Sequence, residues 1–418
     1  MSYYKNKVCC VIDNGLFTEL AITLSKSFGK VWYYSPWEQA FPRSNEILVG
    51  SGLPGVTRVD SIWPVLDDID LFVFPDIFHG PLQVYLQKLG KRVWGGRLGE
   101  NLEILRGLSK RWLKEDGLEV GPWRQLRGLD NLRSFLKENE DQYVKIPRTR
   151  GDMETFHAAN YKLIEPRLDE LEHSLGAKKH IQEFIVESPI NPAIEVGYDG
   201  YVIDGKFPET ALYGVETKDA AYIGQVVEYR ELPEGIKTVN SALSDRFADW
   251  TYRGFFSSEI RVKDGKPYLI DPCCRMASPP GELYQHMMTN LADILWHGAM
   301  GDLVEPVFEN KWGAQLVMRS SWAEHNWMAV DMPASVRDNV KLHYLTRIKG
   351  KNYVIPQAIE MAEIGAVVAT GDSAEDAIKN VTKIADKIEG YGIKFNFEAL
   401  EQAKTEMEKL NGEKAKAA

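Results

Sequence analysis

The sequence has few cysteines and no excess of positive charge. Four cysteines in 418 residues are too few for a disulfide scaffold, which predicts a reduced, cytoplasmic protein. A net charge of −10 argues against a broad basic face for nucleic acid, although a local basic pocket could still hold a small anion. No apolar run approaches the roughly 20 residues that span a bilayer, and the N-terminal residues show no signal-peptide pattern. We therefore expect no membrane or nucleic-acid partner.

Two common site motifs are also missing. The first apolar run, KVCCVID, ends at Asn14-Gly15 without the GxGxxG pattern, so a dinucleotide site is weakly supported. The cysteines form the adjacent pairs Cys9-Cys10 and Cys273-Cys274 instead of C-x-x-C, and adjacent cysteines rarely bind one zinc ion. The chemistry is therefore expected from other residues.

The order of apolar runs predicts several domains, because 418 residues exceed what one hydrophobic core usually holds. Strand-like and helix-like segments alternate from the N-terminus to about residue 100, which is typical of a doubly wound α/β domain. Later hairpin patterns indicate an α+β region. Near the C-terminus, Ser373 is a suitable N-cap for the helix that follows it, with Glu375-Asp376 in the first turn.

An expected hairpin at residues 254–271 carries two carboxylates. Its sequence turns at Asp264-Gly265, a pair typical of tight β-turns. Folding about this turn places Glu259 and Asp271 near each other on adjacent strands. Two such carboxylates suit Mg²⁺, which takes few protein carboxylates and uses water and phosphate oxygens for its other positions. A solvated pair of charges on a hairpin is the other interpretation of this spacing.

Two lysines and one strand could add a nucleotide site. Lys145 lies inside the apolar strand QYVKIP, where a buried ammonium group needs an anionic partner unless it reaches the edge of the sheet. Lys110 lies on an amphipathic helix and would by itself be a solvated residue. The strand IQEFIVES could hydrogen-bond an adenine through its backbone, and Glu195, further on, could accept ribose hydroxyls.

Taken in order, Lys110, Lys145, QEFI, EVGYDG, EIRV and IDPCCR resemble the motifs of the ATP-grasp superfamily of carboxylate–amine ligases. The segments around Lys110 and IGAVVATGDSAEDAIKNVTKIADKI resemble phosphoribosylamine–glycine ligase, and the second also resembles biotin carboxylase. The resemblance covers most of the chain. It implies a pre-ATP-grasp α/β domain at 1–105, an ATP-grasp domain at 106–310 with a mobile lid at about 118–185, a β-rich module at 311–400 and a tail at 401–418.

The resemblance also implies roles for individual residues. Lys110 and Lys145 match the two lysines that bind the nucleotide phosphates. Gln182 and Glu183 match the adenine-edge positions, with Phe184 and Ile185 supplying linker backbone, and Glu195 matches the acid that contacts ribose. At the reacting end, the resemblance implies that Glu259, Asp271 and Cys273 are metal ligands and that Arg275 holds an acyl phosphate or substrate carboxylate. Lys218, beside Glu216, could make a further contact with phosphate or substrate.

The sequence departs from the family pattern at Asp271, at Cys273 and in the lid loop. In the usual Glu-x-Asn-x-Arg, Asp271 stands for the Glu and Cys273 for the Asn, and a thiol is a poor ligand for a hard cation. The lid loop is usually rich in glycine, but here it has Gly151 alone with Arg148 and Arg150. Those arginines could bind an anion or simply form an exposed basic loop.

The resemblance implies an enzyme that uses ATP and Mg²⁺ to join a small-molecule carboxylate to an amine through an acylphosphate, as a monomer or homodimer. A phosphotransferase on the same fold is the first alternative. A nucleotide-binding protein with a degenerate site is the second, for which Asp271 and Cys273 are the best argument. The sequence does not identify the acid or the amine.

Overall fold

The computed structural model describes residues 4–36, 48–148, 155–191, 194–356 and 362–417. The N-terminal part is a five-stranded parallel sheet in the order β3-β2-β1-β4-β5. Its order reverses at β1, the arrangement of a doubly wound sheet, as expected. The elements are β1 (Tyr4–Ile12), α1 (Thr18–Ser25), β2 (Phe28–Tyr34), β3 (Val56–Arg58), β4 (Leu71–Val73), α2 (Gly80–Lys88) and β5 (Arg92–Trp94).

The helix expected at 99–118 is broken into two pieces. The backbone of Leu105 leaves the helical region at φ −101° and ψ 61°, which ends α3 (Asn101–Ile104) and starts α4 (Arg106–Glu115). The two short helices connect the N-terminal sheet to the rest of the chain. Their polar residues Glu103, Arg106 and Lys110 are all buried.

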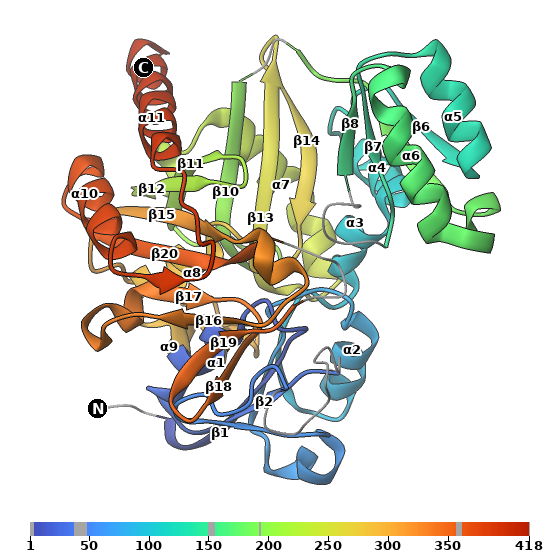
Figure 1. The fold of residues 1–418 in the computed structure, drawn as a ribbon. Coiled ribbons are helices and arrows are strands. Elements are labelled where there is room, and N and C mark those ends of the chain that lie inside the picture. Colours follow the sequence, from blue (N-terminus) through green and yellow to red (C-terminus); the bar gives the residue numbers. More distant parts are fainter. Residues whose placement is uncertain (1–3, 37–47, 149–154, 192–193, 357–361, 418) are drawn as a thin grey trace.

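The segment expected to form the lid, and called the lid below, folds as a separate four-stranded antiparallel sheet in the order β6-β9-β7-β8. Its strands are β6 (Trp123–Arg127), β7 (Gln142–Lys145), β8 (Thr155–Ala158) and β9 (Glu183–Glu187). Two helices, α5 (Leu129–Glu138) and α6 (Tyr161–Leu175), cover one face and enclose its own small apolar core. Figure 1 shows this lobe standing to one side of the main body.

The main body is built on an eight-stranded sheet in the order β14-β13-β10-β11-β12-β15-β20-β17. The expected boundary at 310/311 falls within it, because β15, β17 and β20 extend the sheet that the earlier strands begin. These strands are β10 (Ile194–Ile203), β11 (Thr210–Thr217), β12 (Ala221–Glu228), β13 (Arg253–Lys263), β14 (Lys266–Cys273), β15 (Trp312–Arg319), β17 (Val340–Leu342) and β20 (Glu363–Gly371).

Helices pack on both faces of this sheet. Near β10 and β13, α7 (Glu234–Asp249) packs on Tyr198, Phe256 and Ile260, all buried. Because side chains alternate along a strand, the neighbouring residues Asp199, Ser257 and Glu259 face the other way. The remaining helices are α8 (Gly281–Met287), α9 (Leu291–Gly298), α10 (Ala374–Ala385) and α11 (Glu398–Ala417).

A second four-stranded sheet completes the C-terminal part, in the order β18-β19-β16-β21. Its strands are β16 (Met328–Asp331), β18 (Leu345–Ile348), β19 (Lys351–Val354) and β21 (Glu389–Gly390). The expected N-cap of α10 is confirmed, since the Ser373 hydroxyl accepts a hydrogen bond from the Asp376 amide at 3.1 Å. Short 3₁₀ helices lie at Trp63–Asp68, Arg97–Glu100, Gly176–His180, Tyr229–Glu231, Ser321–Glu324 and Ala334–Asn339. No helix in the described ranges is long and apolar enough to cross a membrane.

Candidate active site

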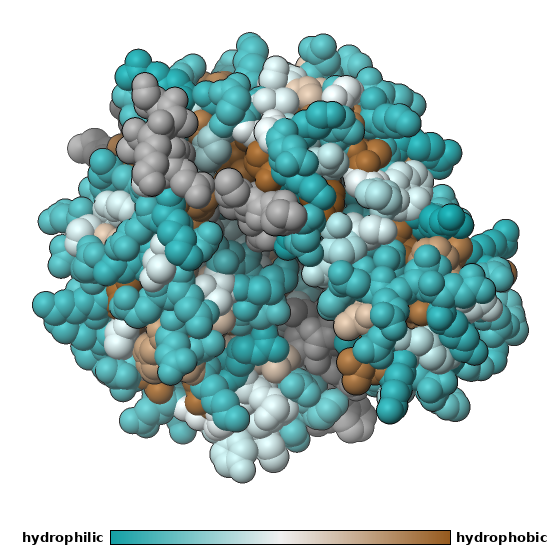
Figure 2. Space-filling view, turned by 90° about the horizontal axis from the view of Figure 1, so that it is seen from above, coloured by the Kyte–Doolittle hydropathy of each residue, from teal (hydrophilic) through white to brown (hydrophobic). Residues whose placement is uncertain are grey.

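A cavity of about 1010 Å³ lies between the lid and the main sheet. Lid residues such as Tyr143 and His157 form one wall, while Asp199 and Glu259 of the main sheet form the floor. Figure 2 shows a mostly hydrophilic surface that is hollowed between the main body and a lobe at one side. The size and polarity suit a charged ligand larger than a single ion.

The two carboxylates of the expected hairpin meet on the floor of this cavity. Glu259 on β13 pairs directly with Asp271 on β14, and both line the cavity. Asp264 and Gly265, with φ of 52° and 75°, form the turn. A bulge after Glu259 leaves Ile270 as the extra residue on β14. The prediction that the two carboxylates are neighbours is therefore confirmed.

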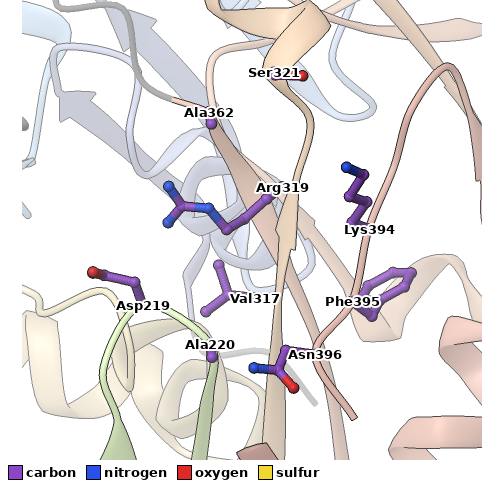
Figure 3. A pocket seen from close by; sticks show the side chains of 9 residues that line it. All are labelled: Asp219, Ala220, Val317, Arg319, Ser321, Ala362, Lys394, Phe395 and Asn396. Atoms are coloured by element: carbon purple, nitrogen blue, oxygen red, sulfur yellow. The ribbon is translucent and has the colours of Figure 1, made fainter.

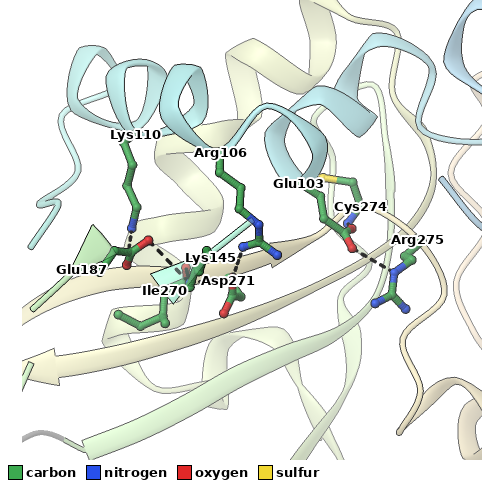
Figure 4. A network of polar contacts seen from close by, with 9 residues as sticks. All are labelled: Glu103, Arg106, Lys110, Lys145, Glu187, Ile270, Asp271, Cys274 and Arg275. Carbon is green, nitrogen blue, oxygen red and sulfur yellow. Dashed lines mark hydrogen bonds and ion pairs between the residues drawn. The ribbon is translucent and has the colours of Figure 1, made fainter. Parts of the chain in front are cut away.

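Asp271 is held by two cations. It accepts hydrogen bonds from Lys145 Nζ at 2.8 Å and from an Arg106 guanidinium nitrogen at 2.7 Å, as drawn in Figure 4. Burial alone would raise the pKa of Asp271, but the two cations hold it well below the usual range. Asp271 is therefore an anion that Lys145, from the lid, and Arg106, from α4, share.

Glu187 joins the two expected phosphate lysines. Its carboxylate lies 2.9 Å from Lys110 Nζ and 3.6 Å from Lys145 Nζ. Burial lowers the pKa of Lys110, while Glu187 opposes the shift. Lys110 and Lys145 thus converge from α4 and β7 on one point, where they are neutralised by carboxylates in the absence of a ligand. A polyphosphate could take over those carboxylate contacts.

Arg275 has a fixed partner. Its Nε donates to Glu103 at 3.0 Å, and the Cys274 amide donates to the other Glu103 oxygen at 2.8 Å (Figure 4). Cys274 is buried, and burial raises the pKa of its thiol well above the ordinary value. Such a thiol is a poor nucleophile, and Cys274 is a packing residue.

Cys273 does not complete a metal centre of three side chains. It lines the cavity, and its sulfur lies 3.9 Å from the Arg275 carbonyl. Within the described part of the chain, no group of three or more His, Cys, Asp or Glu residues has the geometry to hold a metal ion.

Glu216 lies near the end of β11, and Lys218 lies in the turn that follows this strand. Both residues also line the cavity. Enclosure by protein raises the pKa of Glu216 to about 8, and the Lys218 charge opposes this shift. The side chain of Glu216 nevertheless has an exposed surface that faces the cavity. Burial alone would lower the pKa of Lys218, but the Glu216, Glu259 and Asp271 charges raise it. Lys218 is therefore a third cation near the carboxylate pair.

Of the expected nucleotide residues, Gln182 and Glu183 lie away from this cluster, whereas Ile185 pairs directly with Lys145 across β9 and β7. Gln182 and Glu183 are at the start of β9, whereas Glu187, which contacts both lysines, is at its end. Four residues of strand separate Glu183 from Glu187 by about 13 Å at roughly 3.3 Å per residue. Phe184 and Ile185 are buried within the lid sheet.

Four further positions of the sequence prediction lie in or beside the parts of the chain that are not described. Glu195 pairs with Arg261 through β10 and β13, but its side chain lies outside the described residues. Arg148 is exposed with φ of 63°. Gly151 and Arg150 lie outside the described ranges, so the basic-loop hypothesis stays a prediction.

Sequence reasoning missed Arg106 and Glu187. Arg106 lies one helical turn before Lys110, and that spacing on an amphipathic helix could have placed both on one face. Glu187 ends the apolar strand EFIVE, and an acid at the end of a buried strand was a visible signal. Glu103, the partner of Arg275, gave no comparable signal because the break at Leu105 separates it from α4.

A smaller cavity of about 370 Å³ borders the same turn through Asp219. Figure 3 shows the charged ends of Arg319 and Lys394 pointing away from one another. Because the two cations do not converge, we assign no ligand to this cavity.

No protein-family model and no curated protein matches this sequence. The structure is similar to phosphoribosylamine–glycine ligase of Thermotoga maritima, with a TM-score of 0.71 and 14% identity over 93% of this chain and 98% of that one. It is similar to the biotin carboxylase domain of Hydrogenobacter thermophilus 2-oxoglutarate carboxylase, solved with MgADP, ADP and bicarbonate (TM-score 0.64, 11% identity, 93% and 91% covered). It also resembles N5-carboxyaminoimidazole synthetase of Staphylococcus aureus complexed with ADP, with a TM-score of 0.59 and 13% identity over 92% of this chain and 99% of that one.

At these identities the likeness establishes the fold. The chain has the ATP-grasp architecture of these ligases over nearly its whole length. This confirms the fold expected from the sequence.

Proposed function

We propose that this protein is an ATP-dependent ligase that joins a carboxylate to an amine and releases ADP and phosphate. The observation that carries the proposal is the convergence of Lys110, Lys145 and Arg106 beside Glu259 and Asp271 in one cavity. Nucleotide-bound ligases of the same fold support it. The substrate carboxylate attacks the γ-phosphate to form an acylphosphate. The amine then displaces phosphate, and the proton it loses leaves with the phosphate.

Four cations have distinct roles in this proposal. Lys110 and Lys145 bind the polyphosphate after exchanging Glu187 and Asp271 for phosphate oxygens. Arg275, oriented by Glu103, binds the substrate carboxylate or the acyl group. Lys218, which the Glu259 and Asp271 charges also affect, stabilises the charge on the phosphate that is transferred. The lid shields the acylphosphate from water.

Mg²⁺ fits part of this donor set. Glu259 and Asp271 are paired oxygen donors and suit one hard cation that takes its other ligands from phosphate and water. The Cys273 sulfur does not suit it. A bound Mg²⁺ would neutralise phosphate charge, and Arg106 supplies a further positive charge at the same place.

We propose that the backbone at the end of β9, residues 187–190, forms the adenine edge in place of the expected Gln182–Ile185 backbone. This segment begins at Glu187, which contacts Lys110 and Lys145, and Ile190 within it is buried.

The test measures ADP release in the presence of Mg-ATP, a panel of carboxylic acids and hydroxylamine. A ligase forms an acylphosphate that hydroxylamine converts to a hydroxamate, so ADP and hydroxamate appear together and depend on the acid. A phosphotransferase to a hydroxyl gives ADP and a stable phosphate ester without hydroxamate. ADP binding without turnover on any acid would support the degenerate-site alternative instead.

Replacing Cys273 with Asn should strengthen Mg²⁺ binding. The variant offers an amide oxygen where the sulfur lies, and oxygen is the donor that Mg²⁺ prefers. We expect half-maximal turnover at a Mg²⁺ concentration several-fold lower than in the wild type, with activity equal or higher. A titration of turnover against free Mg²⁺ measures this, with Cys274→Ser as the matched thiol control. A large loss of activity in Cys273→Asn would show that the thiol itself has a chemical role.

A further inference from the structure

Asp199 is a buried carboxylate that the proposed reaction does not use. It lies on β10, lines the cavity and is 8% exposed. The Tyr222 hydroxyl donates to it at 2.7 Å, and Ser257 lies opposite it on β13. Burial raises the pKa of Asp199 to about 6, and the hydrogen bond from Tyr222 only partly offsets the shift. Its hydrogen-bond partner is therefore neutral.

The other carboxylates of the cavity wall have a cation beside them. Glu216, Asp219 and Glu259 act on Lys218. The others form ion pairs: Glu103 with Arg275 at 3.0 Å, Asp271 with Lys145 at 2.8 Å, Glu363 with His343 at 3.7 Å and Glu406 with Lys409 at 3.1 Å. Within the described residues, no ion pair is formed by Asp199. A buried charge is costly unless it is paired, so the missing partner points to a cationic ligand.

The position of Asp199 fits such a ligand. Asp199 pairs across the sheet with Ser257, which in turn pairs with Cys273. Two residues further along β13 and β14 lie Glu259 and Asp271, a step of about 7 Å at roughly 3.4 Å per residue. Asp199 therefore lies next to the phosphate-binding end of the cavity.

Resting on the proposed function, we propose that Asp199 binds the ammonium form of the amine substrate beside the acylphosphate and accepts one of its protons, which frees the nitrogen lone pair for attack. The substrate class is then a primary amine that is protonated at neutral pH. Tyr222 orients the carboxylate through its hydroxyl. An uncharged amide or alcohol would leave Asp199 buried and unpaired, so the site discriminates against both.

The test uses hydroxylamine as the acceptor, because it is largely neutral at pH 7.5. The carboxylic acid is the one from the panel that gives the most hydroxamate. Methylammonium chloride is then titrated in at constant ionic strength, with tetramethylammonium chloride as a cation that cannot donate hydrogen bonds. The wild type is compared with Asp199→Asn, which keeps the shape and the Tyr222 contact. Asp245→Asn removes the same charge from an exposed position on α7. Each variant's inhibition is referred to its own uninhibited rate.

We expect methylammonium to suppress hydroxamate formation in the wild type and in Asp245→Asn, and at least tenfold more weakly in Asp199→Asn. Equal inhibition of Asp199→Asn and the wild type, no inhibition of the wild type, or equal inhibition by tetramethylammonium would overturn the inference. ADP affinity reports whether Asp199→Asn is folded, and Asp199→Ser replaces it if it is not. No hydroxamate with any acid would instead overturn the proposed function, and with it this inference.

Discussion

Replacing Lys145 with Met should lower ATP turnover by about 10²–10³-fold or more, the range seen when one preorganised charge donor is removed from a reacting site. Lys145 is 3% exposed and contacts both Asp271 and Glu187. Methionine keeps the length and apolar stem of the side chain but cannot bind a phosphate oxygen. The effect should appear in kcat and in nucleotide affinity, because a phosphate contact serves the ground state and the transition state.

The fold should survive this substitution. Asp271 keeps Arg106 as a partner, and Glu187 keeps Lys110, so neither carboxylate is left without a cation. Lys162→Met, at an exposed position on α6 of the same lid, is the matched control and should turn over like the wild type. Steady-state ADP release and thermal unfolding measure the two effects. Turnover of Lys145→Met within a few-fold of the wild type would show that the cavity does not bind the phosphates in the proposed way.

Local patterns in the sequence predicted several features of this site. The Asp264-Gly265 turn set the register of β13 and β14 up to Ile260 and Leu269, and the bulge at Ile270 then brings Glu259 opposite Asp271. The Ser373 cap and the polar lysine inside QYVKIP are equally local signals. Such features depend on residues a few positions apart, where propensity and turn chemistry decide the conformation.

The rest depends on contacts between distant segments. Arg106 and Asp271 are 165 positions apart, and nothing near either residue predicts the other as its partner. The helix break at Leu105 is likewise not marked by the residues around it. The contact between Glu187, at the end of β9, and Lys110 joins segments that are far apart in the sequence. Likewise, the neutral surroundings of Asp199 become visible only when Tyr222 and Ser257 are brought to it by the sheet.

Replacing Asp271 with Asn should also abolish turnover, with a loss of at least about 10²-fold. The amide removes one of the two paired carboxylates that suit Mg²⁺ and leaves Lys145 and Arg106 facing a neutral group. Added Mg²⁺ should not restore the rate, because the remaining Glu259 is a single carboxylate. The matched control is Asp264→Asn at the exposed turn of the same hairpin, where Asn tolerates a positive φ.

The stability of Asp271→Asn should depend on pH in a defined direction. In the wild type, Lys145 and Arg106 hold the folded-state pKa of Asp271 below its unfolded value. The carboxylate therefore contributes stability above the ordinary aspartate range, and this contribution is lost as the pH falls toward the folded-state pKa. We expect the variant to unfold at a lower temperature than the wild type at pH 7 and the gap to narrow under acid conditions. A gap that widened on acidification, or an active variant, would mean that Asp271 is not the anion on which the phosphate-binding cations converge.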